Sequence, residues 1–180
     1  MIHRVSLALC SLLLLLDPSG QSLSAQERAA RLGPIELLGD GPSYAEASLG
    51  AFNALDMDDH GASAAGQIQL RWGRKLYFIG PAIGLMGNTD GGAFGYAGIY
   101  SDLAYGNVMA TPLLGAGGYV EGDSKDLGGV FQFRTGLGIA YQFDDGTRLG
   151  VRVAHISNAG IHDDNPGEED LMLVYSSPFP

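Results

Sequence analysis

The sequence predicts an all-β fold, an eight-stranded antiparallel transmembrane β-barrel, and three observations support this prediction. The composition combines 28 glycines with only 17% charged residues, and no long helical pattern is present, which favours short strands linked by turns. From Tyr44 onward the chain divides into segments of about ten residues, the length of a strand in such a barrel. The connections between the segments alternate between long and short, as extracellular loops and periplasmic turns of outer-membrane barrels do.

Residues 1–25 indicate an export signal. A basic start precedes an apolar run at 5–16, and Asp17-Pro18-Ser19-Gly20 then interrupts it. This run is too short for a spanning helix, which needs roughly 20 apolar residues. The small residues Ser24 and Ala25 offer a site for signal peptidase, and we expect cleavage after one of them.

The mature chain is expected to be one domain without a disulfide. The only cysteine, Cys10, lies inside the predicted signal. Residues 26–43 lack a strand pattern and are expected to form a periplasmic N-terminal segment, and residues 44–180 to form the barrel. Cleavage would remove Arg4 and Asp17 together, so the formal net charge stays at −10. This charge argues against nucleic acid as a partner.

Eight segments with strand character follow in order. They are 44–53, 63–73, 75–86, 93–103, 107–119, 129–143, 147–157 and 169–179. The predicted connection at Arg74 has almost no length, whereas those before 63 and 129 and after 157 are long. An even number of strands with alternating loop lengths is typical of an outer-membrane barrel.

Polar and apolar residues alternate along the segments. In 63–73, Gln67, Gln69 and Arg71 alternate with apolar residues, and 129–143 shows the same pattern with glycine and alanine at several polar-face positions. A narrow eight-stranded barrel needs small side chains in its interior. The polar face is therefore expected to line the interior and the apolar face to contact lipid.

A soluble lipocalin-like carrier is the alternative fold, with the apolar face inside the barrel. Alternation alone cannot choose between the two arrangements. The export signal, the unequal loops and the glycine-rich polar face favour the membrane barrel. No glycine belongs to a complete G-x-G-x-x-G or phosphate-binding loop.

Three polar residues lie on the face that is expected to contact lipid. His155 and Ser157 continue the apolar face of 147–157, and Glu169 has the parity of the apolar residues in 169–179. An ionisable histidine facing lipid is costly and indicates function. A serine, a histidine and an acid are the nucleophile, base and orienting group that activate a hydroxyl for acyl transfer.

The count of strands places these residues near the outer leaflet. If the N-terminus is periplasmic, the seventh strand ends and the eighth begins at the outer surface. Diagonal neighbours on paired antiparallel strands are about 7–8 Å apart, which a glutamate can span. Lipid A is the lipid of that leaflet, and it becomes the expected substrate.

Two motifs at this hairpin carry a family resemblance. They are His155-Ile156-Ser157-Asn158-Ala159-Gly160 and Asn165-Pro166-Gly167-Glu168-Glu169. Together with 123–128 and 133–138, they resemble the lipid A 3-O-deacylase (PagL) family. The resemblance covers at least residues 120–179, and the earlier strands agree in pattern and number only.

The resemblance implies a carboxylic ester hydrolase that removes the ester-linked acyl chain at position 3 of lipid A. It implies Ser157 as the nucleophile, His155 as the base and Glu169 as the orienting acid, within a barrel catalytic domain at 44–180. It also implies that Asn165 and the backbone near Gly160 stabilise the oxyanion. Such donors typically contribute about 3–4 kcal/mol.

The resemblance further implies that Asn158 organises the loop and that the reaction uses no cofactor and no metal. The pair Glu168 and Glu169 leaves the orienting acid open, although alternation favours Glu169. The expected location is the bacterial outer membrane, with lipid A and membrane lipids as partners. A homodimer and a monomer both remain open. The alternative function is a non-enzymatic barrel for adhesion, stability or a pore.

Aromatic residues are expected near the periplasmic ends of the strands, where a girdle anchors such barrels in the interface. They are Trp72, Tyr77, Tyr105, Phe143 and Phe179.

Overall fold

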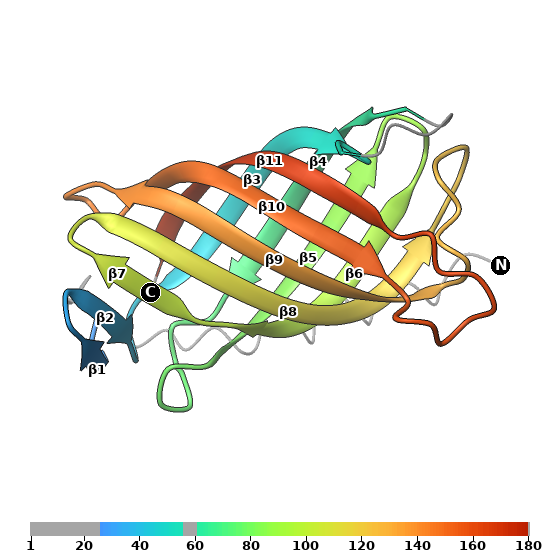
Figure 1. The fold of residues 1–180 in the computed structure, drawn as a ribbon. Helices are drawn as coiled ribbons and strands as arrows, with labels where there is room; N and C mark the ends of the chain where they lie inside the picture. The colour runs from blue at the N-terminus through green and yellow to red at the C-terminus, as the bar shows by residue number, and fades with distance from the viewer. Residues whose placement is uncertain (1–25, 56–60, 180) are drawn as a thin grey trace, which may run out of the picture.

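The computed structural model describes residues 26–55 and 61–179, which form eleven strands in one sheet (Figure 1). The predicted signal peptide lies outside the described residues. None of the described residues belongs to a helix that is long and apolar enough to cross a membrane. The strands are β1 (Arg28–Leu32), β2 (Ile35–Leu38), β3 (Ser43–Phe52), β4 (Ser63–Arg71), β5 (Gly80–Asn88), β6 (Ala93–Tyr100), β7 (Asp102–Tyr105), β8 (Val108–Val120), β9 (Phe131–Gln142), β10 (Arg148–Ser157) and β11 (Glu168–Phe179).

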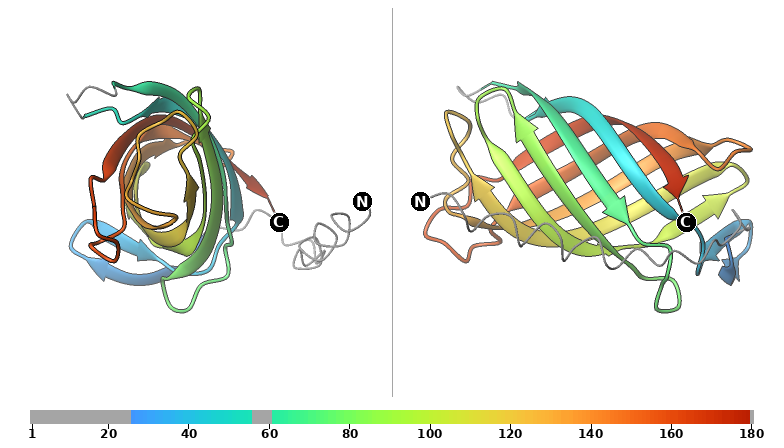
Figure 2. Two further views of the ribbon diagram at one scale, coloured as in Figure 1. Left: turned by 90° about the vertical axis from the view of Figure 1, so that its right-hand side faces the viewer. Right: turned by 180° about the vertical axis from the view of Figure 1, so that it is seen from behind.

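The sheet closes into a barrel. Each wall strand pairs antiparallel with its neighbour, β3 pairs with β11, and the additional pairing of β8 with β9 completes the ring seen end-on in Figure 2. β6 and β7 are interrupted only at Ser101 and both pair with β8, so they form one wall strand. The wall therefore has eight strands, and the predicted all-β antiparallel barrel is confirmed.

The start of one predicted strand was wrong. The segment 75–86 was expected to follow Arg74 directly, but β5 begins at Gly80 and residues 72–79 form a loop. Leu76 and Ile79 pair in an isolated antiparallel bridge, which closes a tight turn. The residues of this turn are as apolar as strand residues, so composition could not distinguish them. The other wall strands begin and end within about two residues of the predicted bounds.

The expectation that residues 26–43 lack strands was also wrong. β1 and β2 form a hairpin, and β2 pairs with β7. The pairing of β5 with β6 ends at Gly80 and Tyr100, so β7 continues beyond its wall neighbour. The free backbone groups of β7 need hydrogen-bond partners, and β2 supplies them.

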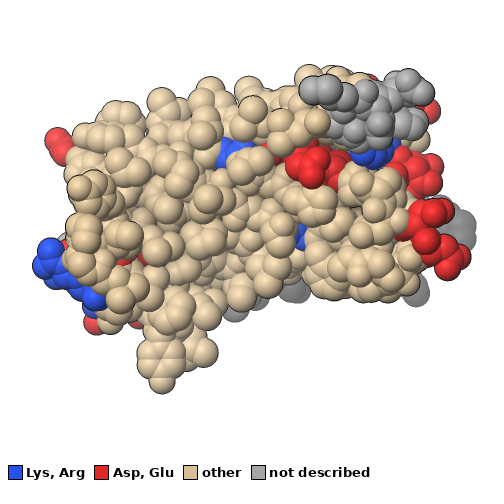
Figure 3. Space-filling view, in the orientation of Figure 1, with Lys and Arg blue, Asp and Glu red and all other residues tan. Residues whose placement is uncertain are grey.

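The two faces of the wall differ as the alternation predicted. Outward side chains such as Leu49 and Ile68 are 73% and 63% exposed, whereas the inward Gln67 is 3% exposed. Figure 3 shows a largely uncharged wall, with charged residues gathered toward the two ends. The apolar face points outward, which is the arrangement of a membrane barrel and excludes the carrier-like alternative.

Buried ion pairs occupy the lumen. Asp102 Oδ1 lies 3.0 Å from Arg148 Nη1 and 3.4 Å from Arg71 Nη1. A second pair joins Glu46 to Arg152, and all of these side chains are at most 2% exposed. Removal of one partner from a buried pair of this kind lowers the free energy of unfolding by about 3–5 kcal/mol. Because long charged side chains fill the interior, the structure does not favour the alternative of a pore.

Candidate active site

The hairpin of β10 and β11 brings His155 and Glu169 together. They face each other directly in the antiparallel register, closer than the diagonal neighbours expected from the sequence. The Nδ1 atom of His155 lies 3.0 Å from Oε1 of Glu169. The two side chains are 45% and 37% exposed, so they form a polar pair on the outer wall.

Ser157 is the last residue of β10 and lies two residues beyond His155 on the same face. Its neighbour in the register of β9 is Phe133. No hydrogen bond to the Ser157 hydroxyl is present among the described residues. Contacts between a nucleophile and its base are often long without substrate. Because Glu169 engages Nδ1, the nitrogen of His155 that remains for Ser157 is Nε2.

The neighbouring acid, Glu168, points the other way. It is 1% exposed in the lumen, and its Oε2 atom accepts a hydrogen bond of 3.0 Å from the backbone N–H of Asn53. Asp170 also faces the lumen, where Arg134 Nη2 donates to its Oδ1 over 3.0 Å. Glu169 is therefore the acid of this pair that contacts His155.

An apolar cluster inside the barrel holds β10 in place behind the site. Ile156, which separates His155 from Ser157, points into this cluster and is 0% exposed. Phe52 and Phe94 belong to the same cluster, as does Leu127 from the loop that joins β8 to β9. The strand that carries the serine and histidine is thus fixed by packing on its opposite face.

Asn158 ties the loop after β10 to its surroundings. Its buried Nδ2 atom donates to the carbonyl oxygens of Leu127 and Asp164, over 3.0 and 2.6 Å. Its Oδ1 atom accepts the backbone N–H of Gly160 at 2.9 Å. The backbone N–H of Asn158 donates to Oδ1 of Asn165 at 3.0 Å. These four bonds connect the residue after Ser157 to two loops.

The two candidate oxyanion donors differ in their present partners. The amide N–H of Gly160 already donates to Asn158. Asn165 uses its side-chain oxygen as an acceptor, which leaves its amide nitrogen as the donor. Asn165 also lines an open cleft of about 480 Å³ together with residues of both loops. Among the described residues, the side-chain amide of Asn165 thus has a donor that no protein group engages, whereas the N–H of Gly160 is engaged.

Gly167 lies against the His155 ring, a contact that its place in the sequence motif did not reveal. Its φ is +64°, and a Cβ atom there would lie 2.9 Å from Cε1 and 3.4 Å from Nε2 of His155. The missing side chain leaves room for the imidazole ring. A positive φ and a contact with a ring are properties of the folded chain, so neither is visible in the sequence.

The loops around the site carry exposed carboxylates, among them Asp126, Asp163 and Asp164. Acidic residues gather at this end of the molecule in Figure 3. Within residues 26–55 and 61–179, no group of three or more His, Cys, Asp or Glu side chains could hold a metal ion.

Comparison with known families identifies the chain. The family model described as Lipid A 3-O-deacylase (PagL) matches residues 44–178, which is the whole barrel up to its last residues. This chain belongs to the lipid A 3-O-deacylase (PagL) family. The matched range contains every residue of the site described above, and it extends the resemblance from 120–179 to the earlier strands.

Two curated members of the PagL family match a shorter segment. Lipid A deacylase PagL of Bordetella bronchiseptica is 38% identical over 55 residues, which is 31% of each protein. Lipid A deacylase PagL of Pseudomonas aeruginosa is 37% identical over 55 residues, 31% of this chain and 32% of that protein. The chain thus spans about a third of the length of the curated relatives that it matches.

A solved PagL structure shares the fold. The crystal structure of the outer membrane enzyme PagL aligns with a TM-score of 0.59 and 18% identity, covering 76% of this chain and 99% of the other. The fold of this PagL-family member is therefore that of an outer-membrane β-barrel.

Proposed function

We propose that this protein hydrolyses the ester-linked acyl chain at position 3 of lipid A in the outer membrane. Ser157 is the nucleophile, His155 the general base, and Glu169 the acid that orients it. The observation that carries the proposal is the 3.0 Å contact between His155 and Glu169 on the outer wall, with Ser157 on the same face. Family membership supports the class of substrate.

The level of the site along the barrel supports lipid A as the substrate. The triad lies at the end of β10 and the start of β11, and the turn that joins these strands is at the end of the barrel opposite the C-terminus and the β1–β2 hairpin (Figure 1). Barrels of this class keep their termini in the periplasm. The triad then lies at the level of the outer leaflet, where lipid A is the membrane lipid. An opening of the wall is not needed, because the side chains already face the lipid.

The first half of the proposed reaction forms an acyl-enzyme. Ser157 Oγ attacks the ester carbonyl carbon, and its proton passes to Nε2 of His155. Glu169 accepts a hydrogen bond from the Nδ1–H group and stabilises the resulting imidazolium. When the tetrahedral intermediate collapses, the bond to the sugar oxygen breaks, and His155 returns the proton to that oxygen. The products are an O-acyl-serine and lipid A with a free 3-hydroxyl group.

The second half uses water as the nucleophile. His155 removes a proton from water, which attacks the acyl-serine carbonyl and releases a free fatty acid, and the proton returns to Ser157 Oγ. In both halves, the Nδ2 group of Asn165 donates to the negative oxygen of the intermediate. The hydrogen bond that Asn158 makes to Asn165 Oδ1 supports this role, because it fixes the amide plane. The triad comes from β10 and β11 of one chain, so no second copy is required.

The experiment is mass spectrometry of lipid A after exposure to the purified, folded protein. The expected result is the loss of one acyl chain, with fragmentation that locates the loss at position 3 and recovery of the free fatty acid. The matched control is Ser177→Ala, since Ser177 is a serine of β11 near the opposite end of the barrel. Ser177→Ala should act at the parental rate. The proposal is wrong if folded Ser157→Ala releases the 3-linked chain as fast as the parent.

A further inference from the structure

The loop between β4 and β5, at the end of the barrel opposite the triad, carries an exposed apolar tip. Leu76 and Tyr77 are 75% and 80% exposed, and Phe78 and Ile79 are 37% and 39% exposed. We call residues 76–79 the apolar spur. Contiguous apolar patches of this kind mark interaction surfaces rather than ordinary solvated loops.

The base of the spur is fixed to the barrel. The side chain of Lys75 enters the barrel mouth, where its Nζ atom lies 3.3 Å from Oδ2 of Asp102 and is fully buried. The backbone N–H of Lys75 donates to Oδ1 of Asp40 at 2.7 Å. On the other side, the Ser101 hydroxyl donates to the carbonyl oxygen of Phe78 at 3.0 Å. The spur is therefore held from both sides.

The tip itself is a closed turn. The backbone groups of Leu76 and Ile79 exchange two hydrogen bonds of 2.9 and 3.0 Å. Tyr77 has a φ of +61°, a conformation that a bulky residue adopts only where its surroundings impose it. These two hydrogen bonds close the turn and pair the backbone groups of its first and last residues, so the tip presents four apolar side chains to its surroundings.

The spur projects sideways from the barrel. In Figure 1 the loop descends from the wall near the end that carries the C-terminus, and in the end-on view of Figure 2 it lies outside the ring of strands. In Figure 3 the same protrusion shows no charged residue on the face seen. A lateral projection at the end of a lipid-facing wall points into the border between acyl chains and headgroups.

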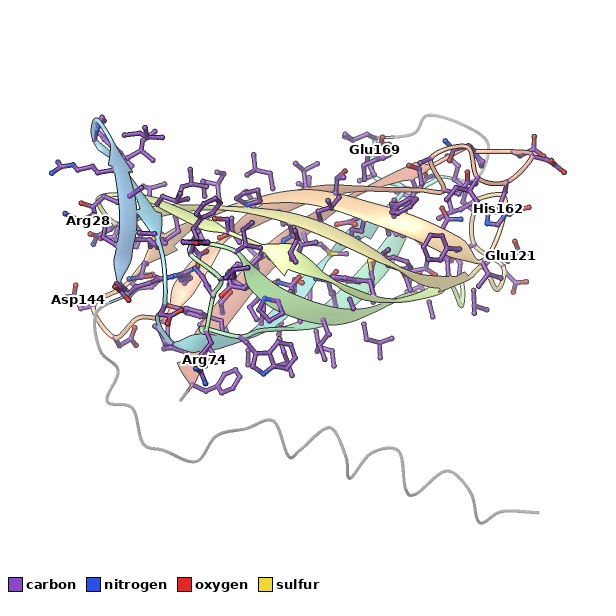
Figure 4. All side chains as sticks on the ribbon, turned by 90° about the horizontal axis from the view of Figure 1, so that it is seen from below. Arg28, Arg74, Glu121, Asp144, His162 and Glu169 are labelled. Carbon is purple, nitrogen blue, oxygen red and sulfur yellow. The ribbon has the colours of Figure 1, made fainter. Side chains whose placement is uncertain are left out.

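The residues beside the spur fit that border. Arg74, labelled in Figure 4, lies two residues before the spur and is exposed, so its charge can reach phosphate groups while the tip is buried. Tyr105 and Phe143 are 62% and 45% exposed at neighbouring turns of the same end. Aromatic and basic residues together are typical of the membrane interface.

We propose that the apolar spur inserts into the phospholipid leaflet opposite the triad and anchors that end of the barrel at a fixed depth. The occupant of this surface is phospholipid, because the spur continues the lipid-facing wall and a basic residue stands beside it. Of these four residues, only Tyr77 was predicted from the sequence to lie in an aromatic girdle. The structure instead assigns a closed, four-residue apolar turn to the interface.

The test uses tryptophan fluorescence in single-barrel phosphatidylcholine nanodiscs. Trp72 is the only tryptophan of the chain, so Trp72→Phe removes the native tryptophan fluorescence and Tyr77→Trp then introduces a single tryptophan in the spur. One set of discs contains lipids brominated along the acyl chains, and iodide probes exposure to water. Leu173→Trp, on the outer wall, is the lipid-facing reference, and Asp144→Trp, in the turn between β9 and β10, is the water-facing reference.

The expected result is that the tryptophan at 77 loses as much fluorescence to brominated lipid as the one at 173 and is shielded from iodide. Quenching by iodide to the level of the tryptophan at 144, without quenching by lipid, would place the spur in water and overturn the proposal. Quenching by neither agent would mean that protein covers the spur, which also overturns it. Leu76→Trp repeats the measurement if Tyr77→Trp does not fold.

Discussion

The hairpin of β10 and β11 has two faces that carry similar groups in different environments. On the outer face, Glu169 meets His155 and both side chains are partly exposed. On the inner face, Asp170 pairs with Arg134, and both side chains are 0% exposed. Because adjacent residues of a strand point to opposite faces, one residue separates a pair suited to chemistry from a pair that supports the barrel. Substitutions on one face should therefore spare the property that belongs to the other.

The largest effect is expected from Ser157→Ala. Removal of a nucleophile of this kind lowers turnover by about 10⁶-fold. Ser157 lies at a strand end on the outer wall, so its truncation leaves no cavity and the folded barrel should persist. The rate of lipid A deacylation measures turnover, and the heat-dependent gel shift measures whether the barrel remains folded. The double variant of Ser157→Ala and His155→Ala should have a turnover only slightly lower than that of Ser157→Ala alone, since such groups act as a unit.

Glu169→Gln and Glu168→Gln test the two faces at adjacent positions. Loss of the orienting acid lowers turnover by about 10⁴-fold in comparable triads, so Glu169→Gln should have an effect of that size. Glu168→Gln should leave turnover close to the parental value, because Glu168 points into the lumen. Initial rates on lipid A at saturating substrate measure both. A larger loss of turnover from Glu168→Gln than from Glu169→Gln would show that Glu168, and not Glu169, orients His155.

Asp170→Asn should affect stability first. It leaves the guanidinium of Arg134 buried without its charged partner, which costs about 3–5 kcal/mol of the free energy of unfolding. Denaturant unfolding in detergent, followed by tryptophan fluorescence, measures the loss. The fraction that remains folded should keep its turnover number, and a turnover loss as large as that of Glu169→Gln would show that the two faces are not separable.

The smallest effect is expected from Gly167→Ala. A Cβ atom at 167 would lie 2.9 Å from His155 Cε1, and a displacement of about 1 Å in a catalytic group can cost about 10²-fold in rate. Gly33→Ala is the matched control, because Gly33 has a φ of +61° with no atom within 4 Å of the added Cβ. Both variants carry the same backbone strain, so only Gly167→Ala should lower turnover. Equal turnover in the two variants would exclude the ring contact.

Much of the fold was predictable because the residues of a barrel wall alternate between an inward polar face and an outward apolar face. Alternation in residues such as Gln67, Ile68 and Gln69 specifies the two faces, and strand number follows from the spacing of turns. The rule fails where composition and conformation disagree. The apolar residues 76–79 resemble a strand but form a turn, and 28–38 form a hairpin because β7 needs a partner.

The residues of the proposed site could be singled out from the sequence, but their contacts could not. Parity placed His155, Ser157 and Glu169 on one face, and motif resemblance supplied their proposed roles. The register that sets Glu169 directly opposite His155 depends on the turn at 158–167, whose geometry involves Ala159 at a φ of +54°. The contact of Gly167 with the imidazole and the bonds of Asn158 to distant loops are tertiary features, so a linear pattern cannot contain them.

The outward orientation of the His155–Glu169 pair changes how substrate concentration must be counted. A pair on the outer wall meets molecules that diffuse within a leaflet, so the relevant quantity is the number of lipid A molecules per unit of membrane area. Dilution of the vesicles in buffer leaves this surface density unchanged, whereas dilution of lipid A with another lipid lowers it. Rates should therefore follow the mole fraction of lipid A in the membrane and not its amount per volume of solution.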